Sequence, residues 1–505
     1  MELEQRYCEM IFARWESLIE RRAPQLTDWE ASIAEARVER SPALRPPYVQ
    51  DASDWGPKTD VARVFAGRAA GVDSRRLCVA KRIPVAYRTL DLPQGDPNRH
   101  IPGGEWWFFS GMGTGLDGTI YSGLCDHRFQ YTGALLIAYH PGTGAVRHLA
   151  DMQEVCGQRH RYELMGQTKI HTRIAADSDG RIYLGTHSCE RDYAPPELKE
   201  KLTGGYPGGH WIRYDLDTDL CEDLGIAVAG ESLMGFALDP RTHRIYATTH
   251  TKALLVEFDI ASLRTEVIGS VGKYPTRVVE RTADGTVYTF DDEGRVVRFD
   301  PRSRELRTLD AQLPGFEGDV NMLTSFCTVV GLDGHTIYGV STAFHMEPRE
   351  PMGEVVEGRK MEFRPGYAFA YETQYGSDGQ MRRIGPAGGG SNESVSDLQL
   401  HHAITLTRNG DAMYVSARGD QPAHLIMIDL EACGSQAGAV ATRGEKVIDL
   451  GEMWGDGEEG YVETALAATT GLDGTVYFGG PRKSDKYVRD HVRWALIMLP
   501  DGCWL

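Results

Sequence analysis

Short runs of alternating apolar and polar residues fill most of the chain, and one phrase recurs between pairs of these runs. The phrase is a turn dipeptide followed by an apolar residue and a tyrosine, as in Asp117-Gly-Thr-Ile-Tyr121. Close copies end at Tyr183, Tyr288, Tyr338 and Tyr477, and looser copies end at Tyr246 and Tyr414. Because Asp-Gly between two alternating runs is a strong hairpin signal, the sequence predicts seven similar β-hairpins.

The spacing of these hairpins indicates how they are assembled. The seven tyrosines stand 62, 63, 42, 50, 76 and 63 residues apart, which leaves room for four short strands in each unit. A second strand pair follows in several units, for example in Trp211-Ile-Arg-Tyr-Asp-Leu-Asp-Thr218. A β-sandwich or two stacked barrels would not explain seven copies of one hairpin. We therefore predict an all-β fold, a seven-bladed β-propeller, over residues 105–505.

The two ends of the chain have different patterns. Apolar residues at helical spacing near the start, then a proline-rich stretch, predict an N-terminal helical extension and linker over residues 1–60. Residues 61–104 are a connecting segment. The seventh unit stops soon after Trp494, so it lacks an outer strand of its own. We expect a strand from the N-terminal stretch, near residues 77–87, to complete this blade and close the ring.

Composition narrows the classes of partner. The chain has 54 basic and 72 acidic residues, a net charge of −18, which argues against nucleic acid or an anionic membrane as the partner. Nine scattered cysteines with no C-x-x-C pair argue against a disulfide scaffold or a zinc ribbon. No apolar run approaches a membrane helix, and the start does not resemble a signal peptide. We expect a cytoplasmic protein, or a secreted one if a leader has been removed; the oligomeric state is left open.

The repeat also places polar residues on one rim of the predicted propeller. The start of the first strand and the end of the second strand of a hairpin lie together, opposite the Asp-Gly turn. His171 stands nine residues before Gly180, and His187 stands four after Tyr183, so both fall on this rim. Comparable positions in other units, and the loop and third strand of unit two, add further polar candidates: Tyr193, Tyr206, His210, Arg213, His250, Arg277, His401 and His402. Convergent polar groups in a propeller mouth predict a functional site.

Common catalytic motifs are missing from the sequence. Gly113-Thr-Gly-Leu-Asp-Gly118 matches G-x-G-x-x-G, but it precedes a predicted strand and does not open a helix. There is no H-E-x-x-H, G-x-S-x-G or P-loop motif. The sequence therefore contains no motif that is typical of zinc proteases, of α/β-hydrolases or of phosphate-binding loops.

Three segments of unit two resemble those of the seven-bladed β-propeller polysaccharide lyases of the ulvan lyase and rhamnose-glucuronate lyase type. They are Lys169-Ile-His-Thr172, Tyr183-Leu-Gly-Thr-His187 and Gly204-Gly-Tyr-Pro-Gly-Gly-His-Trp-Ile-Arg-Tyr214. The resemblance implies cleavage of a uronic-acid-containing oligosaccharide or polysaccharide by β-elimination, without a required cofactor. The loop between His187 and Arg213 is shorter than in those lyases.

The resemblance also implies roles for individual residues. His171 and His187 would be the paired histidines, a loop tyrosine the acid or base, and Arg213 the group that neutralises the substrate carboxylate. Tyr193 and Tyr206 both remain open as the tyrosine, and Tyr206 is preferred because it adjoins the Gly-Gly-His turn. The expected contacts with the anionic carbohydrate are Tyr193, His210, His250, Arg277, His401 and His402.

The chemistry of β-elimination fits these residue types independently. The reaction needs a base beside a carboxylate, a cation to neutralise that carboxylate, and an acid for the leaving oxygen. A tyrosine, with an ordinary pKa near 10, could serve as base only beside a cation that lowers its pKa.

Two alternatives belong to other classes. His171, His187, His250 and His401 could instead bind a divalent metal such as Mn, Ca or Fe, as histidine clusters do in oligogalacturonate lyases and propeller-shaped oxygenases. The propeller could also be a non-catalytic binding scaffold, because the fold alone does not determine function.

Overall fold

The structure is a computed structural model. It describes residues 48–50, 82–84, 86–89, 107–126, 133–142, 145–158, 161, 164–188, 200, 202–315, 322–345, 362–364, 366–388, 403–418, 421–429, 446–454, 461–483 and 493–499. Nearly all of the predicted helical extension and linker, residues 1–60, therefore lies outside the described residues. The part that is described, β1 (Tyr48–Gln50), is a strand that pairs with the first blade.

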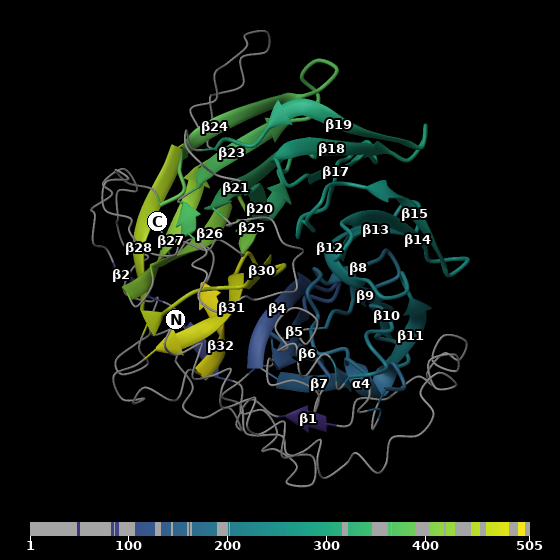
Figure 1. The fold of residues 1–505 in the computed structure, drawn as a ribbon. Coiled ribbons are helices and arrows are strands. Elements are labelled where there is room, and N and C mark those ends of the chain that lie inside the picture. Colours follow the sequence, from purple (N-terminus) through teal and green to yellow (C-terminus); the bar gives the residue numbers. More distant parts are fainter. Residues whose placement is uncertain are drawn as a thin grey trace.

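The described strands form the predicted seven-bladed β-propeller, with the blades arranged around a central axis (Figure 1). Each blade is an antiparallel sheet of four main strands, here called A to D from the axis outward. Blade one contains β4 (Trp107–Thr114), β5 (Ile120–Asp126), β6 (Leu135–His140) and β7 (Ala145–Asp151). Blade two contains β8 (Ala175–Ala176), β9 (Ile182–Gly185), β10 (His210–Asp215) and β11 (Leu220–Ile226). The short helix α4 (Met152–Val155) lies between these two blades in the chain.

The next three blades repeat the same order. Blade three contains β12 (Ser232–Asp239), β13 (Arg244–His250), β14 (Leu254–Asp259) and β15 (Arg264–Ser270). Blade four contains β16 (Glu280–Arg281), β17 (Val287–Phe290), β18 (Arg295–Asp300) and β19 (Glu305–Gln312). Blade five contains β20 (Met322–Val330), β21 (Thr336–His345), β23 (Tyr367–Glu372) and β24 (Gln380–Pro386), with β22 (Glu362–Arg364) beside the end of β21.

Blades six and seven are joined at their edges. Blade six contains β25 (Ile404–Leu406), β26 (Ala412–Arg418), β27 (Gln421–Asp429) and β28 (Lys446–Trp454), and β2 (Arg82–Pro84) runs parallel to β28. Blade seven contains β30 (Ala467–Thr470), β31 (Val476–Lys483), β32 (Arg493–Leu499) and β3 (Ala86–Thr89). The two-residue strand β29 (Tyr461–Val462) pairs with both β28 and β31.

The ring closes as the sequence predicts. The outer strand of blade seven, β3, comes from the N-terminal part of the chain and pairs antiparallel with β32, with Tyr87 opposite Ile497. This strand starts inside the predicted segment, residues 77–87, and extends two residues beyond it. Because an unpaired β32 would expose a row of backbone donors and acceptors, the donated strand satisfies the last edge of the propeller.

The recurring phrase has the same structural role in each blade. The glycines of six Asp-Gly or Asn-Gly turns have positive φ angles between 73° and 98°, as tight hairpins require: Gly118, Gly180, Gly285, Gly334, Gly410 and Gly474. The seven tyrosines of the phrase are all buried, at 5% exposure or less, in the layers between blades. Tyr121 of blade one, for example, packs against Tyr214 of blade two with ring centroids 6.1 Å apart.

Two expectations from composition can be compared with the described residues. The cysteines among them are Cys125, Cys156, Cys221 and Cys327, and all four are buried free thiols. None of the helices in the described part of the chain has the length and apolar content needed to cross a membrane.

Candidate functional site

Close backbone packing between blades one and two positions the segment that carries His171. A Cβ atom on Gly111 would lie 2.2 Å from the carbonyl oxygen of Thr172, so only glycine fits there. The amide of Ile174 donates to the carbonyl of Met112. On the other side, the Thr172 hydroxyl accepts a hydrogen bond of 2.8 Å from the amide of Gly185. The segment is therefore held between two inner strands.

Three of the predicted rim histidines lie together. The ring centroids of His171 and His187 are 5.1 Å apart, and those of His187 and His250 are 5.5 Å apart. His187 and His250 are buried, whereas His171 is partly exposed. Lys169 exchanges two backbone hydrogen bonds with His187, which ties the start of strand A to the end of strand B. The offsets counted from the repeat thus predicted a real cluster that spans blades two and three.

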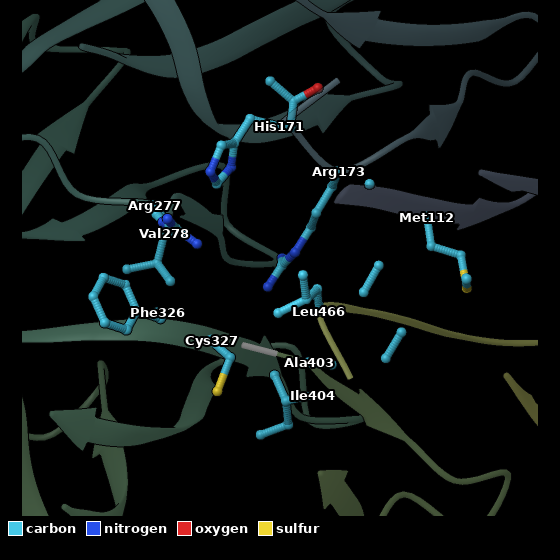
Figure 2. Close-up of a pocket in the computed structure, with 14 residues that line it drawn as sticks. Met112, His171, Arg173, Arg277, Val278, Phe326, Cys327, Ala403, Ile404 and Leu466 are labelled. Atoms are coloured by element: carbon cyan, nitrogen blue, oxygen red, sulfur yellow. The ribbon is translucent and has the colours of Figure 1, made fainter. Parts of the chain in front are cut away.

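His171 also lines a cavity at the axis of the propeller, shown in Figure 2. The cavity is partly open to solvent and receives residues from six blades. Three basic side chains line it: His171, Arg173 and Arg277. The Arg277 guanidinium lies 5.0 Å from the centroid of the Phe326 ring. Two arginines and one histidine of an acidic protein therefore meet at its axis.

These surroundings act on the protonation of His171. Burial, followed by the charges of Arg277 and Lys169 and by His187, lowers the pKa of His171 well below its ordinary value. The His171 imidazole is therefore neutral at neutral pH. A neutral imidazole can accept a proton, and its conjugate acid readily gives that proton up.

Arg173 crosses the axis of the propeller. Its Nη2 atom lies 2.7 Å from Oε1 of Glu280 in blade four, and it also donates to the carbonyl oxygen of Thr328 in blade five. The Thr328 hydroxyl donates to the same Glu280 oxygen at 2.6 Å. Because Arg173 stands two residues closer to the Asp-Gly turn than His171, this network lies deeper in the channel than the histidines.

Arg173 and Lys169 are site residues that the sequence analysis missed. Residues 169, 171 and 173 alternate along the segment that leads into β8, and side chains two apart in an extended segment share a face. The same alternation that defined the hairpins could have placed Arg173 beside His171.

Tyr206 is anchored in the loop of blade two. Its hydroxyl donates to Oε1 of Gln167 at 2.9 Å, and the same oxygen accepts from the hydroxyl of Thr186 at 2.7 Å. Thr186 directly precedes His187, so the loop tyrosine lies on the histidine side of the blade. Its role as acid or base stays a prediction.

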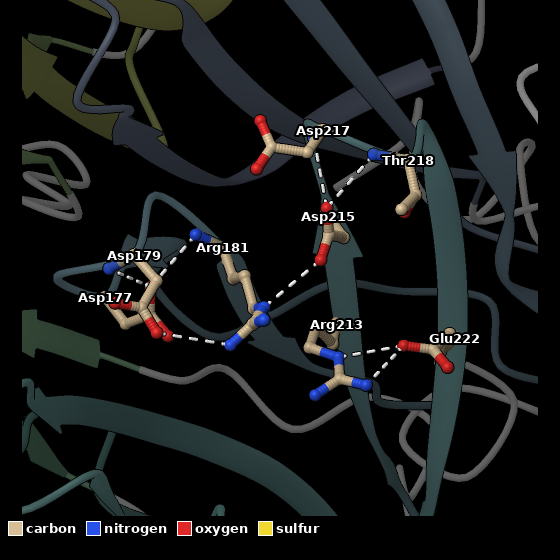
Figure 3. Close-up of polar contacts among 8 residues, drawn as sticks. All are labelled: Asp177, Asp179, Arg181, Arg213, Asp215, Asp217, Thr218 and Glu222. Carbon is tan, nitrogen blue, oxygen red and sulfur yellow. Dashed lines mark hydrogen bonds and ion pairs between the residues drawn. The ribbon is translucent and has the colours of Figure 1, made fainter.

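Arg213 does not belong to the histidine cluster, and its role as the carboxylate-neutralising group stays a prediction that its position does not support. It lies in β10, the third strand from the axis, opposite Tyr183 and Glu222. Figure 3 shows its Nε and Nη2 atoms on one oxygen of Glu222, at 2.9 and 2.5 Å. Proximity in sequence to the loop suggested a rim position, but the strand carries Arg213 outward. Arg277 and Arg173 hold the axial positions.

His210 lies beside Thr186 at the height of the rim, but its side chain points into the blade. Its ring is fully buried, with Nδ1 2.9 Å from both oxygens of Asp223 and Nε2 3.3 Å from the Gln158 amide nitrogen. Both ring nitrogens are therefore engaged inside blade two. We withdraw His210 as a substrate contact.

One possible metal-binding group includes this histidine. Cys156, His210 and Asp223 have potential ligand atoms within 4.8 Å of one another, and among the described residues this is the one group of His, Cys, Asp or Glu side chains with that spacing. His171, His187 and His250 do not approach one another this closely. The His210–Asp223 contact recurs in blade six as His424–Asp449, where Asp449 also accepts from the amide of Gly451 as Asp223 does from Gly225. This recurrence identifies the pair as support for a β-bulge.

The remaining predicted contacts cannot be placed. Tyr193, His401 and His402 lie outside the described residues.

No family model and no curated protein matches the chain. Among solved structures it is similar to Kuenenia stuttgartiensis hydrazine synthase, with 12% identity, 79% of this chain and 97% of that chain covered, and a TM-score of 0.47. It is similar to virginiamycin B lyase from Staphylococcus aureus, at 8% identity, 82% and 99% coverage and a TM-score of 0.46. The RRP9 WD40 repeats give 11% identity, 78% and 94% coverage and a TM-score of 0.47. At these identities the comparisons assign no activity to this chain.

Proposed function

We propose that this propeller is a lyase that acts on a carboxylate by β-elimination, with a uronate-containing oligosaccharide as the substrate class that the resemblance implies. The observation that carries the proposal is the placement of His171 and Arg277 on one axial cavity, with the His187 ring against His171 and the His250 ring against His187. These are the residue types that the reaction needs in one place.

Each group has a part in the proposed reaction. The Arg277 guanidinium binds the substrate carboxylate and neutralises the charge that builds on it. Neutral His171 removes the proton from the carbon beside the carboxylate. The bond from the next carbon to its oxygen breaks, a carbon–carbon double bond forms, and the leaving oxygen receives a proton from the His171 imidazolium. Substrate atoms and electrons balance without an oxidant or a co-substrate.

His187 and His250 support the position of the His171 ring within the cluster. We assign them to positioning, because they are buried behind the partly exposed His171 ring. Tyr206 is the alternative donor to the leaving oxygen.

The test is the ultraviolet absorbance of the conjugated unsaturated product, measured with purified protein and a panel of uronic acid oligosaccharides, with and without a chelator. We expect a chelator-resistant rise that His171→Ala lowers by roughly a hundredfold or more. Arg277→Met should abolish the rise, whereas Arg213→Ala, the matched arginine control, should leave turnover near that of the parent protein. Tyr206→Phe separates the two proton donors, because only the tyrosine route loses activity.

Other results would redirect the proposal. A rise that disappears on chelation would retain the lyase and make the histidines a metal site. No rise with any substrate in the panel would contradict the uronate lyase and favour a binding scaffold or an oxygenase.

A further inference from the structure

Arg173 is at once fixed by the protein and accessible from the axial cavity. Its side chain lines the cavity below His171 and projects toward the opposite wall, as Figure 2 shows. The side chain is 43% exposed, whereas that of its partner Glu280 is 7% exposed. Because Arg173 lies at the axis, this exposed surface faces the cavity. A ligand that enters the cavity can therefore contact the guanidinium.

The protein engages only one nitrogen of this guanidinium. The ion pair with Glu280 and the hydrogen bond to the Thr328 carbonyl both involve Nη2. Nε and Nη1 have no hydrogen-bond partner within the described part of the chain. A guanidinium holds its N–H groups in one rigid plane, so fixing Nη2 also fixes the direction of the other donors. Arg173 thus offers oriented hydrogen-bond donors to a ligand.

The charge of the Arg173–Glu280 pair selects the kind of group that it can bind. Oε1 of Glu280 lies 2.7 Å from Nη2 of Arg173, so the two formal charges cancel at this depth of the channel. A second carboxylate here would be repelled by Glu280 nearly as much as it is attracted by Arg173. A neutral hydroxyl would gain a hydrogen bond from a charged donor without that repulsion. The pair is therefore suited to a hydroxyl group.

We infer that Arg173, fixed by Glu280, binds a hydroxyl group of the sugar unit whose carboxylate lies at Arg277, and that it determines specificity for a hydroxylated uronate. The inference deepens the proposed function and rests on it for the position of the carboxylate. It adds a hydroxyl subsite deeper in the channel than the histidines. No bond of the substrate forms or breaks at Arg173, so its part is recognition.

The test compares two carboxylates that have the same charge and a six-membered ring. Galacturonate carries ring hydroxyls and cyclohexanecarboxylate carries none, and neither has a glycosidic leaving group, so binding is measured apart from turnover. By isothermal titration of the full chain, we expect the parent to bind galacturonate roughly tenfold tighter or more. Arg173→Met should weaken galacturonate by on the order of tenfold and change cyclohexanecarboxylate little, because only the hydroxyl contact is lost.

A second arginine provides the matched control. Arg304 is 39% exposed and pairs with the buried Glu257 of a neighbouring blade, but it does not line the axial cavity. Arg304→Met should leave both affinities unchanged. If Arg173→Met fails to fold because Glu280 loses its partner, the double variant with Glu280→Gln removes both charges together and takes its place.

The outcomes are distinguishable. The inference is overturned if the parent binds the two compounds equally or does not bind galacturonate, or if the Arg173 variant loses both affinities equally. Tighter binding of galactarate, which adds a second carboxylate, than of galacturonate also overturns it. A hydroxyl preference that the variant loses, without elimination from any uronate oligosaccharide, supports the inference and refutes the proposed lyase. Elimination together with a hydroxyl preference that the variant keeps does the reverse.

Discussion

Replacing Gly111 by alanine tests whether the contact between blades one and two sets the geometry of the axial site. The new Cβ atom would lie 2.2 Å from the Thr172 carbonyl oxygen, short of ordinary contact at 3.4 Å by about 1.2 Å. The obstacle is backbone, which cannot rotate away. The segment from Ile170 to Ile174 must therefore move by roughly 1 Å, and it carries His171 and Arg173.

This displacement has a cost in stability and in function. Overpacking of this kind destabilises by about 1–3 kcal/mol, partly offset by the lower entropy of an unfolded chain with alanine. A shift of the strand also moves His171 away from Arg277. We expect an apparent melting temperature lower by roughly a few degrees and a rate of elimination from uronic acid oligosaccharides lower by on the order of tenfold or more.

The assay pairs thermal unfolding with the ultraviolet absorbance of the unsaturated product, and it needs a glycine control from the same blade. Gly142 lies in an exposed turn, where a Cβ atom would meet only the His140 side chain at 3.1 Å, so Gly142→Ala should leave both quantities nearly unchanged. If Gly111→Ala keeps the parent melting temperature and the parent rate of elimination, the close contact does not position the site and the reasoning is refuted.

Two further predictions concern His171 and the closing strand. The pKa of His171 is lower in the folded protein than its ordinary 6.5, so its contribution to stability is present above pH 6.5 and is lost as pH falls below that value, by at most about 1.4 kcal/mol per pH unit. Chemical denaturation between pH 7.5 and 5.5 (about the range where histidine titrates) should show a shallower decline for His171→Gln than for the parent, and identical slopes would contradict the lowered pKa. Arg88→Pro, in the strand that pairs with β32, should lower the melting temperature by roughly several degrees because proline removes a backbone donor and disturbs the ladder; an unchanged value would show that β3 is dispensable.

Much of the fold follows from local sequence signals. An Asp-Gly turn with its tyrosine is determined within a few residues, because the glycine φ angle, the Asp hydrogen bonds and the strand alternation are all local. Blades built from seven copies of this unit bury the faces of their sheets against one another when they close into a ring. The missing outer strand of the last unit predicted a donated strand, because the last strand would otherwise keep an unpaired edge, and β3 provides it.

Part of the candidate site was predictable on the same basis. Within a hairpin the distance from the turn determines the height of a residue on the blade. His171, His187 and His250 were therefore placed on one rim by counting from the turn, and the structure brings their rings together.

Tertiary structure alone decided which partners the charged residues find. Arg213 and Arg173 have the same side chain and both belong to blade two. Arg213 lies in the third strand and pairs with Glu222 nine residues away, whereas Arg173 lies at the axis and reaches Glu280 of another blade. Local pattern determines the face and height of a side chain, but charge pairing depends on which distant blade lies opposite. That arrangement exists only once the ring has closed.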